Sequence, residues 1–141
     1  MNTKVLIPKY VANLPEQLEE GVFYICEEFD ATAHKCCCGC GEEVYNKLGP
    51  AKWQLTKERD GTVSLYPSVG NWKYACRSHY WIENNRVIDA GAMSNRTINA
   101  IQKRDRRDRD KVIAQHNAQT KQSLWHRAST AIARTFNNLC R

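Results

Sequence analysis

The sequence contains no long hydrophobic run. None of its apolar stretches approaches the ~20 residues that a transmembrane helix needs. Its first eight residues also lack the apolar core of a secretory signal peptide. Both absences favour a cytoplasmic protein, in a compartment that keeps thiols reduced.

The motifs of well-known zinc enzymes are missing too. The chain holds neither the His-Glu-x-x-His of metalloproteases nor the His-x-Glu with Pro-Cys-x-x-Cys of zinc deaminases. Proline and glycine are absent from residues 95–141, where helix-favouring residues dominate. With 141 residues, the chain is long enough for one small domain and an extension.

Charge divides the chain into two parts. Residues 95–141 hold eleven Lys or Arg and three Asp, a net charge of +8. Residues 1–94 hold ten basic and twelve acidic residues, a net charge of −2. We therefore expect two parts, which together make an α+β fold: a small β-rich domain over residues 1–93 and a basic helical extension over residues 94–141.

Two hairpins are predicted inside the β-rich domain. Asp-Gly and Asn-Asn pairs accept the positive φ angles of tight turns, and each pair lies between stretches rich in β-formers. The turns are Asp60-Gly61, between residues 53–56 and 63–66, and Asn84-Asn85, between residues 80–82 and 86–88. The other predicted elements are strands at residues 4–7 and 21–26 and a short helical turn at residues 15–20.

The extension is predicted to begin with Ser94 or Asn95 as its helix cap. Residues 98–116 have few apolar residues, and the charge sign alternates over their centre, residues 103–111, as on an exposed helix. Apolar residues then recur every three to four positions, at Leu124, Ala128, Ile132, Phe136 and Leu139. Such an extension can bind a protein partner or pack on its own domain. We rank nucleic acid, bound through phosphates, below these and a membrane surface last.

Four of the seven cysteines fall within five positions, at Cys36, Cys37, Cys38 and Cys40. In a reducing compartment such a cluster is typical of metal binding. Zinc prefers four thiolate or imidazole ligands, and Cys76-Arg77-Ser78-His79 offers a second pair at turn spacing. We therefore expect one structural zinc ion, and a zinc-ribbon-like arrangement of the β-rich domain around it.

More candidates exist than one ion needs. Cys38 and Cys40 are our first choice for the first pair, and Cys37 with Cys40, which has the common C-x-x-C-G spacing, is the close alternative. Cys36 can replace either, and His34 is a ligand or a hydrogen-bond partner of one. A catalytic zinc with three protein ligands and a water stays open, and so does iron as the metal.

The same residues resemble a known family. Residues 34–41 (HKCCCGCG), Trp53, residues 64–72 (SLYPSVGNW) and residues 76–82 (CRSHYWI) carry the likeness, which covers about residues 20–90. The chain is similar to small bacterial metal-binding domains of unknown function, often encoded beside ubiquitin-like proteins and adenylyltransferases that resemble ubiquitin-activating enzymes.

The family pattern has proline where this chain has Cys37, which counts against Cys37 as a ligand. The predicted metal ligands are therefore Cys36, Cys38, Cys40, Cys76 and His79.

The leading functional hypothesis is a non-enzymatic zinc-binding adaptor. Through the resemblance, its partner is a ubiquitin-like protein or adenylyltransferase of a bacterial conjugation system, with defence against phage as one setting. The alternatives are a zinc-dependent hydrolase or ligase-like factor acting on the conjugate, and a nucleic-acid-binding protein using residues 95–141.

No catalytic residue is predicted. Ser68 and Ser78 are candidate nucleophiles, but the sequence assigns neither a histidine–acid partner.

Four aromatic residues are expected to pack a small core: Tyr66, Trp72, Tyr80 and Trp81. A recognition loop at residues 64–72 is the second interpretation.

Overall fold

The computed structural model describes the backbone of residues 1–139 and the side chains of residues 1–123. The chain divides into two compact units, Met1–Asp105 and Arg106–Arg141. The domain boundary predicted at residues 93 and 94 stays a prediction.

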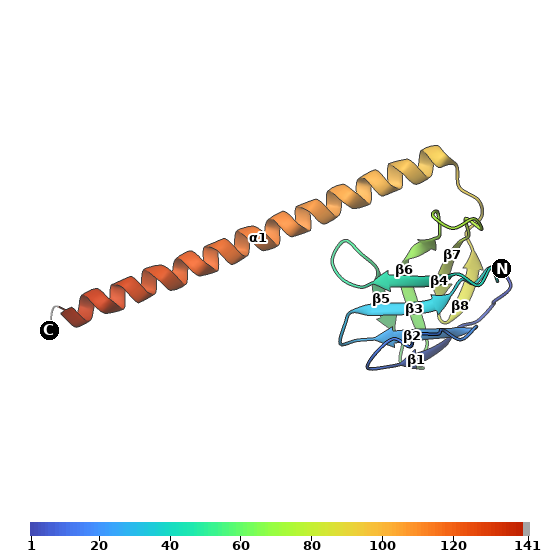
Figure 1. The fold of residues 1–141 in the computed structure, drawn as a ribbon, viewed down its shortest axis with the longest axis horizontal. Coiled ribbons are helices and arrows are strands. Elements are labelled where there is room, and N and C mark those ends of the chain that lie inside the picture. Colours follow the sequence, from blue (N-terminus) through green and yellow to red (C-terminus); the bar gives the residue numbers. More distant parts are fainter. Residues whose placement is uncertain (140–141) are drawn as a thin grey trace. The chain divides into compact units, whose positions relative to one another are not determined.

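The first unit contains two four-stranded sheets (Figure 1). The first sheet has the order β1-β2-β3-β4, in which only the β1–β2 pair is parallel. The second sheet has the order β5-β6-β7-β8 and is antiparallel throughout. The strands of the first sheet are β1 (Ile7–Tyr10), β2 (Val22–Cys26), β3 (Ala31–Lys35) and β4 (Glu43–Lys47). Those of the second are β5 (Gln54–Lys57), β6 (Val63–Gly70), β7 (His79–Glu83) and β8 (Arg86–Asp89).

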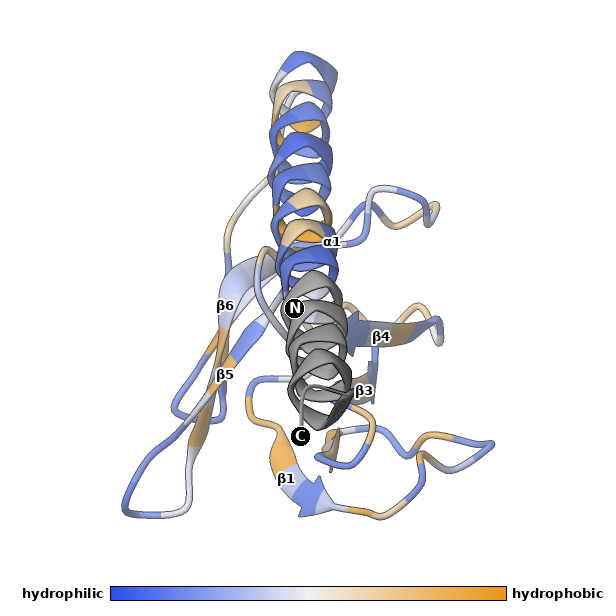
Figure 2. Cartoon of the chain, turned by 90° about the vertical axis from the view of Figure 1, so that its left-hand side faces the viewer, coloured by the Kyte–Doolittle hydropathy of each residue, from blue (hydrophilic) through white to orange (hydrophobic). Residues whose placement is uncertain are grey.

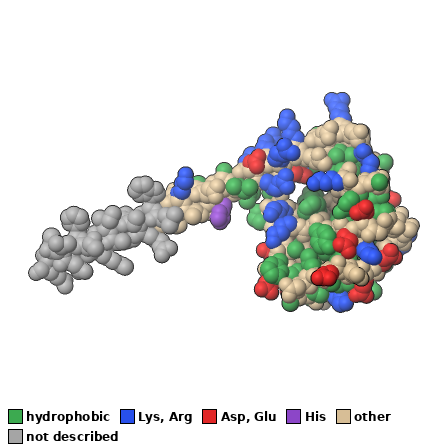
Figure 3. Space-filling model, in the orientation of Figure 1, with side chains coloured by type: hydrophobic (Ala, Val, Ile, Leu, Met, Phe, Trp, Pro, Cys, Tyr) green, Lys and Arg blue, Asp and Glu red, His purple; other side chains and the backbone are tan. Residues whose placement is uncertain are grey.

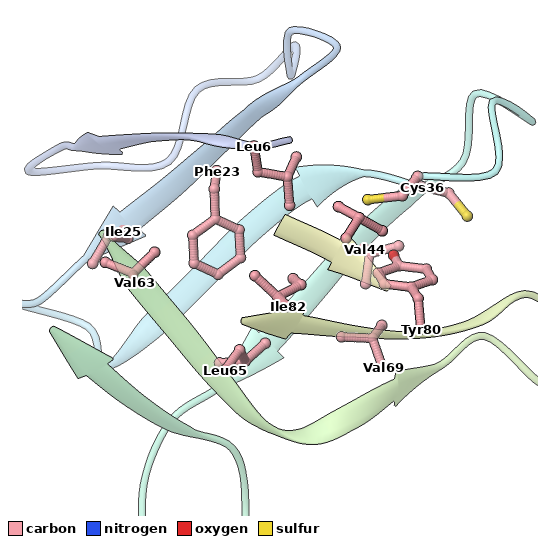
Figure 4. Packing of buried hydrophobic residues seen from close by; sticks show 12 residues of the cluster. Leu6, Phe23, Ile25, Cys36, Val44, Val63, Leu65, Val69, Tyr80 and Ile82 are labelled. Atoms are coloured by element: carbon pink, nitrogen blue, oxygen red, sulfur yellow. The ribbon is translucent and has the colours of Figure 1, made fainter. Parts of the chain in front are cut away.

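The main core lies between the two sheets (Figure 4). Phe23 and Ile25 of β2 and the buried Tyr80 and Ile82 of β7 are among its members. Because side chains alternate along a strand, this burial turns His79 and Trp81 to the opposite, outer face of β7. The outer face of the second sheet is therefore not part of the core, and its side chains are available for a functional site.

Both predicted hairpins are present, and the predicted α+β class is confirmed. β5 pairs with β6 around Asp60-Gly61, and β7 pairs with β8 around Asn84-Asn85. Asn84 and Asn85 have φ angles of 47° and 65°, as a tight hairpin turn of this type requires. The first strand lies later than predicted and includes Pro8, which an edge strand tolerates.

Two local expectations were wrong. Residues 15–20 form bends instead of a helical turn. The backbone amide of Leu18 donates to the Glu43 carboxylate at 3.5 Å, and that of Glu19 donates to the Tyr24 hydroxyl at 3.4 Å. Of the four aromatics expected in the core, only Tyr80 belongs to a core cluster. Tyr66 points outward and is 64% exposed, and Trp72 and Trp81 are members of neither cluster.

The helix α1 (Asn95–Leu139) begins where it was predicted to begin. The Ser94 hydroxyl accepts a hydrogen bond from the backbone amide of Thr97 at 3.2 Å, which is the contact of an N-cap. The described part of α1 is largely hydrophilic and carries many Lys and Arg side chains (Figures 2 and 3). The apolar positions predicted from Leu124 onward lie outside the described side chains.

Within the described residues, no helix combines the length and the apolar character needed to cross a membrane. The cytoplasmic location stays a prediction.

Candidate functional site

Four cysteines meet at one end of the sandwich. Cys36, Cys38 and Cys40 belong to the turn that joins β3 to β4, and Cys76 belongs to the loop between β6 and β7. Their four sulfur atoms all lie within 4.8 Å of one another. This four-cysteine cluster can hold a metal ion.

Glycines shape the turn that carries three of these cysteines. Gly39 and Gly41 have φ angles of 88° and 84°, in the left-handed region that favours glycine. The backbone amide of Gly39 donates to the Cys36 carbonyl at 3.0 Å, and that of Cys36 donates to the Glu42 carbonyl at 2.7 Å. The turn is therefore wound tightly enough to point alternate cysteines at a common centre.

The thiols of the cluster ionise unequally. Burial opposes ionisation of Cys76, but the amide and hydroxyl of Ser78 and the thiols of Cys40 and Cys38 lower its pKa to about 7. Burial, with hydrogen bonding to its neighbours, raises the pKa of Cys38 to about 12. A cation would displace the remaining protons, and a set of four sulfur donors suits zinc or iron.

His79 is not part of this group. It begins β7 on the outer face of the sheet, where its Nε2 lies 2.9 Å from the Ser68 Oγ of β6. Its other ring nitrogen, Nδ1, lies 3.3 Å from the Gly91 carbonyl oxygen. The structure thus brings together four of the five predicted ligands and gives the fifth a different neighbour.

The two remaining ligand candidates also lie apart from the cluster. Cys37 is buried, with its sulfur 4.0 Å from the Lys35 carbonyl oxygen. His34 is fully buried, and its Nε2 lies 2.8 Å from the Tyr80 hydroxyl. Burial lowers the pKa of His34 to about 3, so this ring is neutral near neutral pH.

The contacts of His79 select a tautomer. If Nδ1 carries the hydrogen, it donates to the Gly91 carbonyl, and Nε2 is free to accept the Ser68 hydroxyl proton. The Gly91 amide in turn donates to the Asp89 carboxylate at 2.8 Å. A backbone carbonyl therefore occupies the position that an acid takes beside the histidine of a Ser-His-Asp triad.

Trp72 packs against the same histidine. The centroids of the Trp72 and His79 rings are 5.0 Å apart, with 53° between the ring planes. Gly70 makes room for the indole, because a Cβ at this position would collide with three of its ring atoms. His79 is thus confined by Ser68, Gly91 and Trp72.

Ser78, the other candidate serine nucleophile, contacts the cysteine cluster. Its Oγ lies 3.0 Å from the Cys36 sulfur and accepts a hydrogen bond from the side-chain amide of Asn71 at 2.9 Å. Of these two serines, only Ser68 contacts a histidine within the described residues. The segment from Cys76 to His79 therefore joins the cysteine cluster to the serine–histidine pair.

The chain matches one family model over more than half of its length. The model described as "Bacterial ubiquitination-like system serine protease (BubE)" matches residues 10–89. The chain belongs to the BubE family. It is therefore a component of a bacterial ubiquitination-like system, as the sequence resemblance implied. No match was found among curated proteins or among solved structures.

The matched range contains all the residues of the candidate site except Gly91. Sequence reasoning missed the Ser68–His79 pair because Cys76-x-x-His79 has the spacing of a ligand pair. The signal that could have found it is the alternation along β7, which separates a loop cysteine from a histidine on the outer face of a strand.

Proposed function

We propose that this BubE-family chain is a serine hydrolase, with Ser68 as nucleophile and His79 as general base. The observation that carries the proposal is the 2.9 Å contact between Ser68 Oγ and His79 Nε2 on the outer face of the second sheet. The family's description as a serine protease supports it. The adaptor hypothesis assigns no role to this pair.

The reaction needs only groups that this chain supplies, together with water. His79 Nε2 accepts the Ser68 hydroxyl proton as Oγ attacks the substrate carbonyl carbon. The new C–O bond forms, the bond to the leaving amine breaks, and His79 returns the proton to that amine. Water then attacks the acyl carbon and gives a proton to His79. The bond from the acyl carbon to Ser68 Oγ breaks, and His79 returns that proton to Oγ, which regenerates the hydroxyl.

The four-cysteine cluster would hold a structural metal in this scheme. Cys36, Cys38, Cys40 and Cys76 would supply the four protein ligands that a structural zinc site uses, which would leave no position for a coordinated water. The metal would stabilise the β3–β4 turn and the β6–β7 loop. The donor set therefore supports a structural role over a metal-activated hydrolase, and zinc is the metal we propose.

The substrate class follows from the pathway. We propose that the chain cleaves an acyl bond in a ubiquitin-like protein of its own system or in the conjugates of that protein. This also makes the ubiquitin-like protein the partner.

A fluorophosphonate probe tests the nucleophile directly, because it labels a serine only when a base activates it. We expect the probe to modify Ser68 of the full chain, as mapped by mass spectrometry. Ser68→Ala should abolish labelling, and His79→Ala should slow it on the order of 100-fold or more, the usual contribution of a general base.

Ser64→Ala is the matched control. Ser64 lies on the same strand and face, four residues before Ser68, and its hydroxyl accepts a hydrogen bond from the Asn84 amide at 2.9 Å. This variant should be labelled at the wild-type rate. A folded wild-type chain that the probe leaves unmodified at Ser68 would refute the proposal.

A further inference from the structure

Three large apolar side chains lie on the outer face of the second sheet. Tyr66 of β6 is 64% exposed, and Ile88 of β8 is 43% exposed. Trp81 of β7 is half-buried between them. Contiguous exposed apolar residues usually mark a site of interaction.

The three residues form one continuous strip. The rings of Tyr66 and Trp81 are stacked, with centroids 6.2 Å apart and 26° between the ring planes. Trp81 and Ile88 are direct partners across β7 and β8, so their side chains share a face. The apolar strip therefore crosses three strands.

The apolar strip lies beside the serine–histidine pair. Tyr66 precedes Ser68 by two residues, and Trp81 follows His79 by two residues. Trp81 and His79, two apart on a regular strand, point to the same face about 7 Å apart. Tyr66 and Ser68 lie over that same face, because Tyr66 stacks on Trp81 and Ser68 contacts His79. A register shift between Leu65 and Val69 displaces β6 at this point, as β-bulges near active sites commonly do.

Charged residues limit the strip on the side away from Ser68. Glu83 and Arg86 are exposed direct partners at the end of the β7–β8 hairpin. On the other side, Trp72 packs against His79. The apolar surface is therefore short, with room for about one side chain of an extended chain that advances about 3.3 Å per residue.

We propose that Tyr66, Trp81 and Ile88 form a specificity subsite for an apolar side chain of the polypeptide substrate, within about two residues of the scissile bond. This inference rests on the proposed hydrolase function, since the substrate must bring its carbonyl carbon to Ser68. Chain on either side of that carbon must then cross the outer face of the sheet. The strip is the apolar surface it meets at this distance.

The test uses a library of internally quenched peptides in which every position is varied, cleaved by the full-length chain. We expect the wild type to prefer Leu, Ile, Val or Phe at a position within two residues of the cleaved bond. Trp81→Ala and Tyr66→Ala should lower kcat/KM for the preferred peptides about 10- to 100-fold, mainly through KM.

Further variants distinguish the subsite from general damage. Trp81→Phe should keep the preference, whereas Trp81→Glu should shift it toward Lys and Arg. Tyr45→Ala removes another exposed tyrosine, from the other sheet, at 54% exposure against 64% for Tyr66, and should change nothing. Fluorophosphonate labelling of Ser68 should stay within about twofold of wild type in all of them, because the probe is too small to need the strip.

The outcomes separate the subsite from the hydrolase. Ser68 labelling combined with an unchanged peptide preference in Trp81→Ala and Tyr66→Ala would overturn the subsite alone. A concentration-dependent dimer that these substitutions abolish, without any change in peptide preference, would assign the strip to a second copy of the chain and also overturn it. A wild-type chain that is not labelled at Ser68 would overturn both the subsite and the hydrolase.

Discussion

At the scale of single residues, Gly91 links backbone conformation to the proposed chemistry. Its φ angle is +75°, and its carbonyl contacts His79 Nδ1. A Cβ at Gly91 would meet no atom within 4 Å, so Gly91→Ala adds backbone strain of about 1 kcal/mol without a clash. Because relief of that strain moves the carbonyl, we expect Ser68 labelling to slow about 10-fold or more.

Gly61→Ala is the control for strain alone. Gly61 has a φ angle of +82° and equally open surroundings, but it lies in the β5–β6 turn, outside the serine–histidine site. Both variants should lose similar thermal stability, and only Gly91→Ala should lose labelling. Equal labelling of the two would contradict the role of the Gly91 carbonyl.

Gly70 makes a second prediction at this scale. A Cβ there would collide with the Trp72 indole, and Trp72 packs on His79. Gly70→Ala should therefore displace the indole and slow Ser68 labelling about 10-fold, with a stability cost of about 1–3 kcal/mol.

A double-mutant cycle checks the cause of that loss. In a Trp72→Ala background the collision is gone, so adding Gly70→Ala should have no further effect on labelling. Additive losses in the double variant would show that Gly70 acts on the site by another route.

At the scale of elements, one short segment connects the cysteine cluster to the serine–histidine pair. Cys76 lies in the cluster, and His79 begins β7 three residues later. The Asn71 amide holds Ser78 between them through its hydroxyl, at 2.9 Å. Loss of a metal should therefore loosen His79 as well as the cysteine turn.

We predict one bound metal per chain, measured by elemental analysis, and its loss in Cys36→Ser and Cys76→Ser. Both variants should melt several degrees lower, since ~1 kcal/mol shifts Tm by about 4–8 °C in a domain of this size. Labelling of Ser68 should also slow.

Two cysteines outside the cluster provide the comparison. Cys37→Ala and Cys26→Ser should keep the metal content of the wild type, because neither sulfur belongs to the group of four. A wild-type chain purified without metal, with a melting curve that a chelator leaves unchanged, would show that the cluster is not a metal site.

Local chemistry explains which elements could be predicted. The β5–β6 and β7–β8 hairpins were predicted because Asp60-Gly61 and Asn84-Asn85 encode their own turns. β3 was missed because Ala31–Lys35 reads as ordinary polar sequence, yet its three central residues are buried between neighbouring strands. That burial comes from pairing across the sheet, which single-sequence patterns do not report.

The candidate site has one part that local sequence predicts and one part that depends on long-range strand pairing. Clustered cysteines are a local signal, so four of the five predicted ligands are together in the structure. The partner of His79 is set by long-range pairing, in which Gly70 lies opposite His79 across β6 and β7. The spacing of residues along the chain does not reveal that register, so the sequence alone assigns Ser68 no histidine partner.

At the scale of the whole molecule, the proposed chemistry and most of the basic helix fall in different units. The serine–histidine pair and the cysteine cluster belong to Met1–Asp105. In Arg106–Arg141, none of the described side chains, at residues 106–123, is buried. We therefore expect residues 106–141 to be dispensable for hydrolysis, and the contact of residues 95–141 with nucleic acid or a protein partner stays a prediction.

Deleting residues 106–141 should accordingly leave the first unit folded and reactive. Both clusters of buried residues end before residue 90, so the deletion removes no member of either. We expect a cooperative melting curve, wild-type metal content and Ser68 labelling within about twofold of the full chain.

If the basic residues bind nucleic acid, the full chain should bind duplex DNA with an affinity that falls steeply with salt, and the shortened chain should lose most of it. DNA binding unaffected by salt or by the deletion would refute that contact, and loss of Ser68 labelling on deletion would show that the helix belongs to the site.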